Sequence, residues 1–479
     1  MNQAILLPAS HAVGLLVAVS VGFLVLGLRA STRGLEEYLT ARGTLGARSV
    51  AWTVFASGMG AWILFSPAES ATWGGIPALI GYGLGAAAPV LAFVPLGRRM
   101  RELMPEGHSL TEFVYYRYGS PMYALVLLIM LFYMGIYLTA ELTGLALAVR
   151  LVSGLPLWAS AAVVLGTTLA YTAYGGLPAS VRTDVLQTWL ILPLFVVLVV
   201  GGAAVLGGGG SLAALHEKAP HLLSLRHGAG WETAAVLVVA ILAANLFHQG
   251  YWQRVYAARD PSQLRRGLLV AAALSAPVVF LAGGFGLFAV SVGRAQPAST
   301  ALFGALLPAA PPVLVVVLLV LATALAASTT DTLLNGITSA FTVDLHRVRP
   351  EIPARALLRW ARAATVVVGV PAFVVAAQGY SVLYLFLLAD LVCAAALVPT
   401  FLGLYSTKLS GRGAAWATVL GTLAGFAFFP DPGFQRGRLS LAFLAALGVS
   451  AGVSLLAGRL GSPFDLGRLK GAARVIAEA

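Results

Sequence analysis

Apolar runs of about 20 residues, separated by short polar stretches, follow one another along the whole chain. An α-helix rises 1.5 Å per residue, so a run of that length crosses the hydrocarbon core of a bilayer. The pattern predicts an all-α polytopic membrane protein with thirteen transmembrane helices and no large soluble domain. The expected helices cover residues 11–28, 49–73, 75–97, 121–150, 156–174, 178–206, 232–256, 266–292, 311–341, 359–377, 382–406, 413–429 and 439–458.

The composition excludes other classes of protein. The 479 residues are 59% hydrophobic and 10% charged, whereas soluble domains carry about 25% charged residues. The net charge of +12 would suit a protein that binds nucleic acid, but the basic residues lie in short loops between apolar runs, as in membrane proteins. The single cysteine, Cys393, excludes an intrachain disulfide, and no Cys/His metal cluster is present. The first apolar run has no basic residue before it and no clear cleavage site, so it predicts a retained helix.

The distribution of Lys and Arg predicts the orientation. With the N-terminus outside, 24 of the 30 basic residues fall on the cytoplasmic side, Arg254 among them. Cytoplasmic loops of membrane proteins carry such an excess. We therefore expect a multi-pass protein of the cytoplasmic membrane, with its N-terminus outside and its C-terminus in the cytoplasm.

Polar side chains inside the apolar runs are the candidates for function. Residues 328–332 place five oxygen-bearing side chains in a row, and an aspartate at a helix centre costs about 2.5–3.5 kcal/mol to insert. Such residues line a cavity, bind an ion, or hydrogen-bond another helix, and the sequence leaves these alternatives open. The acidic residues within or beside the expected helices are Glu69, Glu141, Asp184, Asp331 and Asp390.

Two expected helices contain helix-weakening or polar interruptions. Gly58 and Gly60 flank Met59 in the second, and glycine weakens a helix. The seventh ends in NLFHQGYWQR at residues 245–254. Unwound segments with free carbonyls bind ions in many transporters. Close packing through small residues and an interfacial aromatic belt are the alternative explanations.

Four segments together resemble the sodium/solute symporter family over about residues 36–410. FASGMGAW (55–62) is similar to the first core helix, and GGLPASVRTDVLQ (175–187) to a signature with a Gly-Gly turn and a Thr-Asp pair. HQGYWQR (248–254) is similar to the end of the sixth core helix, and ASTTDTLLNGITSAFTVDL (327–345) to the eighth. Some members have Asp directly after the first-helix Ser, where this chain has Gly58.

The resemblance implies a core of five helices and five more in inverted repeat, a LeuT-type arrangement. Residues 1–48 would be a leading helix and loop, 49–206 the first repeat, 207–231 an extracellular loop, 232–408 the second repeat, and 409–479 two accessory helices and a cytoplasmic tail. We expect the protein to function as a monomer.

The resemblance also implies binding sites. The implied sodium ligands are carbonyls of Ala56, Met59 and Leu325 and hydroxyls of Ser328 and Thr329. A second sodium site would use Asp184, Asp331 and Thr332. The substrate would lie near Trp62, Glu141, Gln249, Tyr251 and Asp390.

The expected function is sodium-coupled import of a small polar organic solute by alternating access. Sodium would be the co-transported ion, without an organic cofactor. The two carboxylates among the pocket candidates suit a cationic or hydrogen-bonding solute more than a bare anion, although backbone N–H groups at a helix break can bind a carboxylate. The alternatives are a proton-coupled or uncoupled carrier of the same fold and a solute sensor. An intramembrane enzyme is disfavoured, because no Ser/His pair or HExxH motif lies in the spans.

Overall fold

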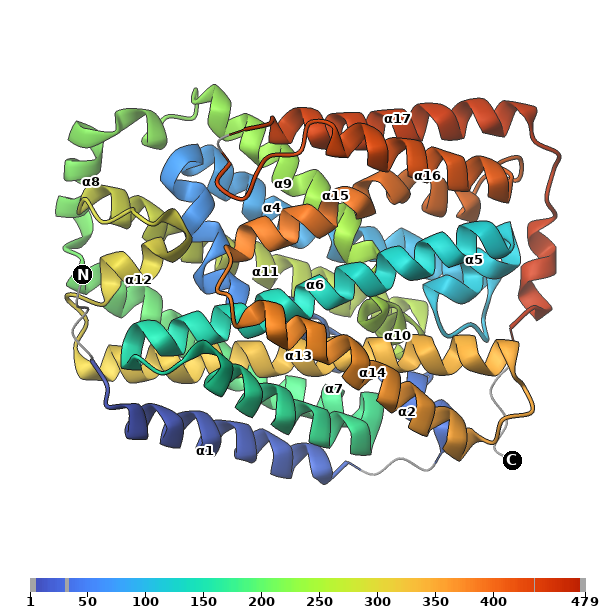
Figure 1. The fold of residues 1–479 in the computed structure, drawn as a ribbon, viewed down its shortest axis with the longest axis horizontal. Coiled ribbons are helices and arrows are strands. Elements are labelled where there is room, and N and C mark those ends of the chain that lie inside the picture. Colours follow the sequence, from blue (N-terminus) through green and yellow to red (C-terminus); the bar gives the residue numbers. More distant parts are fainter. Residues whose placement is uncertain (1–5, 31–33, 435, 474–479) are drawn as a thin grey trace.

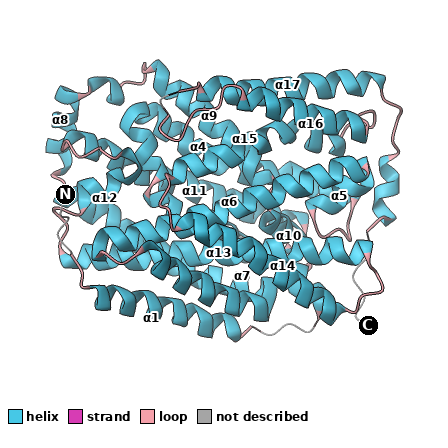
Figure 2. Cartoon of the chain, viewed as in Figure 1, coloured by secondary structure: helices cyan, strands magenta, loops and turns pink. Residues whose placement is uncertain are grey.

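Long helices lie side by side in a bundle (Figure 1), and the chain is almost entirely helical (Figure 2). The computed structural model describes residues 6–30, 34–434 and 436–473. Residues 1–5 and 474–479 of the expected first and last segments thus lie outside the described residues. The fold predicted from the sequence, an all-α polytopic bundle, is confirmed.

Ten of the described helices are long and apolar enough to cross a membrane. The α-helices are α1 Ala9–Leu28, α2 Leu35–Thr40, α3 Ala47–Gly58, α4 Ser66–Leu103, α5 Leu110–Tyr118, α6 Ser120–Ser153, α7 Leu157–Val205, α8 Gly208–Lys218, α9 Gly228–Leu246, α10 Gln249–Ala257, α11 Pro261–Ser291, α12 Ala301–Leu306, α13 Pro312–Val348, α14 Ala354–Ala376, α15 Val382–Phe401, α16 Gly411–Phe426 and α17 Leu439–Leu460. Short 3-10 helices are η1 Ala61–Leu64, η2 Pro220–Leu223, η3 Ala298–Thr300, η4 Leu402–Leu404 and η5 Leu466–Gly471.

The structure differs from the expected helix pattern in how the segments are joined. α4 contains a sharp turn at Gly75 (φ 60°) and α7 one at Gly176 (φ 55°). Gly176 lies between two expected spans, and Gly75 is the first residue of the expected span 75–97. Glycine adopts a positive φ without steric cost, so the chain turns at both positions without a separate loop. Helix α16, by contrast, is short: it has only 16 residues, fewer than a typical transmembrane helix needs. The count of thirteen crossings therefore stays a prediction.

Both interrupted segments are broken in the structure. α3 ends at Gly58, Met59 and Gly60 are extended, and η1 follows before α4 begins. α9 ends at Leu246, and α10 begins after His248, whose ring accepts a hydrogen bond from the Gly250 N–H. These breaks leave backbone groups and side chains available in the interior of the bundle.

A charged cluster ties together the right-hand end of the bundle in Figure 1, where α5 lies. His108 bonds Glu36 at 2.8 Å and Glu112 at 3.3 Å, and Arg42 lies 3.0 Å from Glu36. Burial opposes a charge on His108, but its hydrogen bonds to Glu112 and Glu36 outweigh burial and raise the pKa of His108 to about 9. Burial also opposes ionisation of Glu36, yet His108 and Arg42 lower the pKa of Glu36 to about 2. The pair therefore stays charged near neutral pH and holds α2 against α5.

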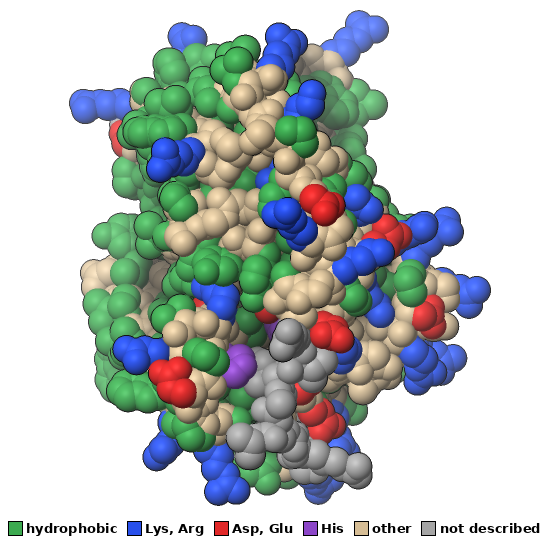
Figure 3. All heavy atoms as spheres, turned by 90° about the vertical axis from the view of Figure 1, so that its right-hand side faces the viewer, with side chains coloured by type: hydrophobic (Ala, Val, Ile, Leu, Met, Phe, Trp, Pro, Cys, Tyr) green, Lys and Arg blue, Asp and Glu red, His purple; other side chains and the backbone are tan. Residues whose placement is uncertain are grey.

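The same end carries many exposed basic side chains. Figure 3, which looks onto it, shows Lys and Arg spread over the surface and fewer Asp and Glu. Such an excess is typical of a cytoplasmic surface.

Candidate ion and solute site

The break after α3 lies against the polar segment of α13. Ser57 Oγ is 2.9 Å from Thr332 Oγ1 and 3.3 Å from Asp184 Oδ2 on α7. Ser328 donates to the other oxygen of Asp184 at 2.7 Å. These contacts bring the end of α3, the middle of α13 and the second half of α7 together in the interior.

The residues expected to bind sodium lie on the two elements that meet here. Ala56 and Met59 are at the end of α3, and Leu325, Ser328 and Thr329 follow one another on α13, which is continuous across this segment. The Ala56 carbonyl accepts from the Met59 N–H at 3.2 Å. Thr329 Oγ1 is fully buried and has no hydrogen-bond partner among the described residues. A buried hydroxyl without a partner is costly, so this oxygen is available to a ligand.

The position of Arg254 differs most from the position that the sequence predicted. The sequence placed Arg254 on the cytoplasmic side at the end of an expected helix, whereas in the structure it lies on α10 and is 0% exposed, inside the bundle. Its Nη2 lies 2.9 Å from Asp184 Oδ2 and donates at 2.9 Å to Thr332 Oγ1. The guanidinium of Arg254 also donates from Nη2 to Ser180 Oγ, from Nε to Thr53 Oγ1 and from Nη1 to the Gly250 carbonyl. A guanidinium thus contacts two of the three residues expected to hold a second sodium ion.

Asp331, the third residue of that expected site, is bonded mostly by hydroxyls of α7. It accepts from Tyr171 Oη at 2.6 Å, Ser180 Oγ at 2.8 Å and Thr183 Oγ1 at 3.0 Å. Three donors satisfy most of a carboxylate's hydrogen-bonding capacity. The structure therefore gives Asp331 a role in binding α13 to α7.

The two carboxylates and the guanidinium have a net charge of −1 when both acids are ionised. Asp184, Asp331 and Arg254 are all fully buried. Buried charge without compensation is unfavourable. One further positive charge would neutralise the cluster.

Side chains from other helices approach the backbone at the break. Glu141 Oε2 accepts from the Ala61 N–H at 2.6 Å. A Cβ at Gly60 would lie 2.2 Å from Glu141 Oε1, and a Cβ at Gly58 would lie 2.6 Å from Tyr251 Oη. Glycine at both positions therefore permits these contacts. The Tyr251 hydroxyl lies where the Asp of some family members would begin.

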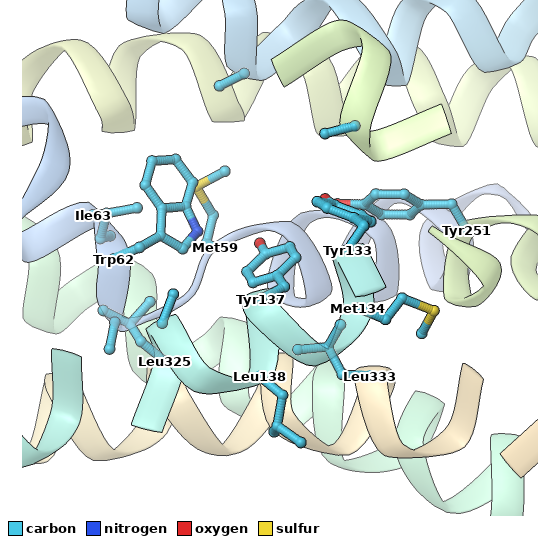
Figure 4. Packing of buried hydrophobic residues seen from close by; sticks show 14 of the residues in the cluster. Met59, Trp62, Ile63, Tyr133, Met134, Tyr137, Leu138, Tyr251, Leu325 and Leu333 are labelled. Atoms are coloured by element: carbon cyan, nitrogen blue, oxygen red, sulfur yellow. The ribbon is translucent and has the colours of Figure 1, made fainter. Parts of the chain in front are cut away.

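A cavity lies beside this break. It is lined by Trp62, Tyr82, Tyr133, Tyr137, Leu237, Ile241, Asn245, Leu383, Phe386, Leu387 and Asp390. In Figure 4, Trp62, Tyr137 and Tyr133 lie in a row between the broken segment and Tyr251.

Two of the five expected substrate residues, Trp62 and Asp390, line this cavity. The other three do not. Glu141 bonds the broken backbone, and Tyr251 contacts Phe93 and His248. Gln249 bonds the His108 carbonyl at 2.8 Å and the Leu110 N–H at 3.3 Å, because α10 turns it toward α5. Sequence reasoning missed Tyr82, Tyr133, Tyr137 and Phe386, although tyrosine within an apolar run is a signal, since its hydroxyl needs a polar partner.

Comparison with known proteins identifies relatives of this chain by sequence. The sequence profile of the Sodium:solute symporter family matches residues 38–421. The spermidine transporter DUR31 of Candida albicans is 27% identical over 376 residues, which are 78% of this chain and 70% of the relative. The urea-proton symporter DUR3 of Oryza sativa subsp. japonica is 24% identical over 410 residues, 77% of this chain and 57% of the relative.

A bacterial relative and a solved structure extend the comparison. The sodium/glucose cotransporter of Vibrio parahaemolyticus is 25% identical over 369 residues, covering 67% of this chain and 65% of the relative. The fold is similar to that of a Na+-coupled sialic acid symporter in a substrate-bound, outward-open state. The TM-score is 0.77 at 19% identity, over 95% of this chain and 99% of the other. The fold expected from the resemblance is therefore confirmed, and these relatives are transporters rather than enzymes.

Proposed function

Because the chain belongs to the Sodium:solute symporter family, we propose that it imports a small polar organic solute together with sodium. The observation that carries the proposal is the broken α3 lying against Ser328 and Thr329 of α13. There the Thr329 hydroxyl has no partner among the described residues, and the neighbouring cluster needs one more positive charge.

Sodium entry supplies the energy in this proposal. A cation moving down the membrane potential releases about 2.3 kcal/mol per 100 mV, and its concentration gradient adds to this. Sodium at the α3–α13 junction would fix the broken segment that also carries Trp62, a wall of the cavity. Ion and solute would then each favour binding of the other by the same factor.

Proton coupling is the second candidate, and one observation favours it. Asp331 and Asp184 are buried carboxylates with one guanidinium between them, so a proton would neutralise the cluster as well as sodium. The relative from Oryza sativa is a urea-proton symporter. Asp184 is paired with Arg254, and Asp331 accepts hydrogen bonds from three hydroxyls. Because both carboxylates already have partners, we expect the cluster to bind one external cation rather than two.

The boundaries of the two repeats, function as a monomer and residence in the cytoplasmic membrane remain parts of this proposal. The structure supports the repeat assignment through its breaks after Gly58 and after Leu246, each in the first helix of an expected repeat.

The topology predicts which residues an impermeant thiol reagent will reach. In a Cys393→Ser background, cysteine at exposed Glu217 on α8 should react in intact cells, and cysteine at exposed Ser462 should not. Ser211 is unsuitable for this test, because its hydroxyl is buried against the Leu206 carbonyl. Labelling at Ser462 but not at Glu217 would reverse the proposed orientation.

A binding screen tests the proposed function and identifies the solute. The purified chain is melted with candidate solutes in sodium and in potassium at equal ionic strength. A ligand that binds only the folded state raises stability by RT ln(1 + [L]/Kd). We expect stabilisation by sodium alone and a larger effect of the correct solute in sodium. Identical melting in both salts with every solute would refute sodium coupling.

A further inference from the structure

Five aromatic rings from four helical segments surround the cavity beside the break. Trp62 is stacked on Tyr82 with ring centroids 5.6 Å apart, and Phe386 meets Tyr137 edge-on at 4.8 Å and Trp62 at 6.2 Å. Tyr133 lies beside Tyr137 on α6, as Figure 4 shows. We call these five residues, Trp62, Tyr82, Tyr133, Tyr137 and Phe386, the aromatic box.

One carboxylate faces the same cavity. Asp390 lies on α15 and is 4% exposed, and its Oδ1 is buried without a hydrogen-bond partner among the described residues. The described part of the chain contributes no Lys, Arg or His to the lining of the cavity. Asn245, the other polar side chain of the lining apart from the tyrosines, donates to the Ile241 carbonyl of its own helix.

These two features favour one class of ligand. The face of an aromatic ring is electronegative and attracts a cation within about 6 Å. A buried carboxylate without a partner is unfavourable and is stabilised by an opposite charge. An anionic group would meet ring faces and Asp390 with no positive side chain to offset them. A neutral solute would leave Asp390 protonated or without a counter-charge, whereas a cation pairs with its ionised form.

We propose that the aromatic box and Asp390 bind the ammonium group of an organic cation, which is the transported solute. This inference rests on the proposed transport function and names its substrate class. The ammonium would lie against the ring faces and donate to Asp390 Oδ1, while Asn245 Oδ1 would accept a further hydrogen bond.

A second carboxylate lies on the route into the cavity. A larger hollow shares Leu237, Leu383 and Leu387 with the cavity and is also lined by Glu69 and Ser381. Both oxygens of Glu69 accept from Ser381 Oγ at 3.0 Å. Ser381 is the N-cap of α15, nine residues before Asp390, so the two acids are about 13 Å apart along the helix. Among the residues that the structure describes, the lining of this hollow also contains no Lys, Arg or His. An extended cation with ammonium groups at both ends would therefore meet an acid at each end.

The two spaces differ in size. The volume that the centres of water molecules can occupy is about 30 Å³ in the inner cavity and about 620 Å³ in the outer hollow. The smaller space holds about two waters, so the box encloses an ammonium head group closely. The alkyl chain would then extend past the three shared leucines toward Glu69.

The test is a binding measurement on the full chain in sodium, with four probes. These are n-hexylammonium, 1,6-diaminohexane, urea and n-hexanol, which is the neutral analogue of the first. The six-carbon diamine is long enough when extended to reach both acids. We expect both amines to raise the melting temperature, and urea and n-hexanol to have no effect at the same concentration. Stronger binding of the diamine than of the monoamine would support the role of Glu69. Equal binding of the diamine and the monoamine would limit the binding site to Asp390 and the aromatic box.

The decisive variant is Asp390→Asn, which keeps the side-chain shape and removes the charge. We expect it to bind n-hexylammonium roughly 10- to 100-fold more weakly, as for loss of a charged hydrogen-bond partner. The matched control is Glu217→Gln, an exposed acid on α8 away from the route, which should bind as wild type. If Asp390→Asn does not fold, Trp62→Phe tests the same site with n-hexylammonium, whose binding should weaken because phenylalanine has the weaker cation–π interaction.

The outcomes separate this inference from the proposed function. Stabilisation by sodium without any effect of the amines, or equal binding of n-hexylammonium and n-hexanol, would overturn the ammonium site and leave sodium coupling intact. Unchanged amine affinity in Asp390→Asn or Trp62→Phe would also overturn it. Loss of the sodium response in wild type would refute the proposed function itself.

Discussion

Replacement of Arg254 by methionine should destabilise the protein by about 3–5 kcal/mol and abolish uptake. Arg254 is fully buried and lies 2.9 Å from Asp184, and it donates to hydroxyls of α3, α7 and α13. Removing one partner of a buried ion pair leaves the other charge uncompensated, which accounts for a cost of this size. Methionine keeps most of the side-chain volume, so the loss of charge dominates. The measurement is denaturant-induced unfolding of the purified protein in detergent.

The double variant Arg254→Met/Asp184→Asn is the control for this prediction. It removes both charges, so most of the stability lost in Arg254→Met should return. Arg254→Met alone with wild-type stability would show that the guanidinium does not hold these helices together. Equal destabilisation of the single and double variants would show that the effect is one of packing rather than charge.

Removal of the Thr329 hydroxyl should raise the sodium concentration for half-maximal uptake roughly 5- to 150-fold. Thr329 Oγ1 is buried without a partner among the described residues, so its loss in Thr329→Ala removes one ion ligand at a cost of about 1–3 kcal/mol. Ser328→Ala should weaken sodium binding as well. It should also lower stability, because the Ser328 hydroxyl donates to Asp184.

The control for the sodium prediction is Thr323→Ala on the same helix. The Thr323 hydroxyl donates to the Leu319 carbonyl of its own helix at 2.8 Å, so its removal should leave the sodium dependence unchanged. If Thr329→Ala and Ser328→Ala both match this control at normal expression, the sodium ion does not bind between α3 and α13.

The sequence predicted the fold and the interrupted helices because both depend on local composition. Runs of apolar residues define the helices, and Gly58 and Gly60 end α3 where expected. The resemblance placed Ser328 in one expected site and Asp184 and Thr332 in a second, and the structure joins the two through the Ser328–Asp184 hydrogen bond. Ser57, which was in neither expected site, contacts both Asp184 and Thr332. The sodium ligand set itself stays a prediction.

The sequence did not predict which polar side chains already have partners. Arg254 follows an aromatic segment that resembles a membrane boundary, and only the turn of α10 into the bundle shows that it pairs with Asp184. Glu141 suggested a substrate ligand, but it bonds the backbone of the break. Tyr82 and Phe386 reach one cavity from separate helices. Such long-range contacts depend on the packing of helices, which periodicity does not encode.

The central claim is that sodium drives uptake, and gradient-driven transport tests it most directly. The purified protein is reconstituted in liposomes, and uptake of the solute identified by the binding screen is followed with potassium inside. An inward sodium gradient at equal pH is compared with an inward proton gradient in potassium alone, because organic cations as replacement ions could compete for the site. We predict concentrative uptake with the sodium gradient and none with the proton gradient. Uptake that follows the proton gradient and is unaffected by sodium would contradict the account.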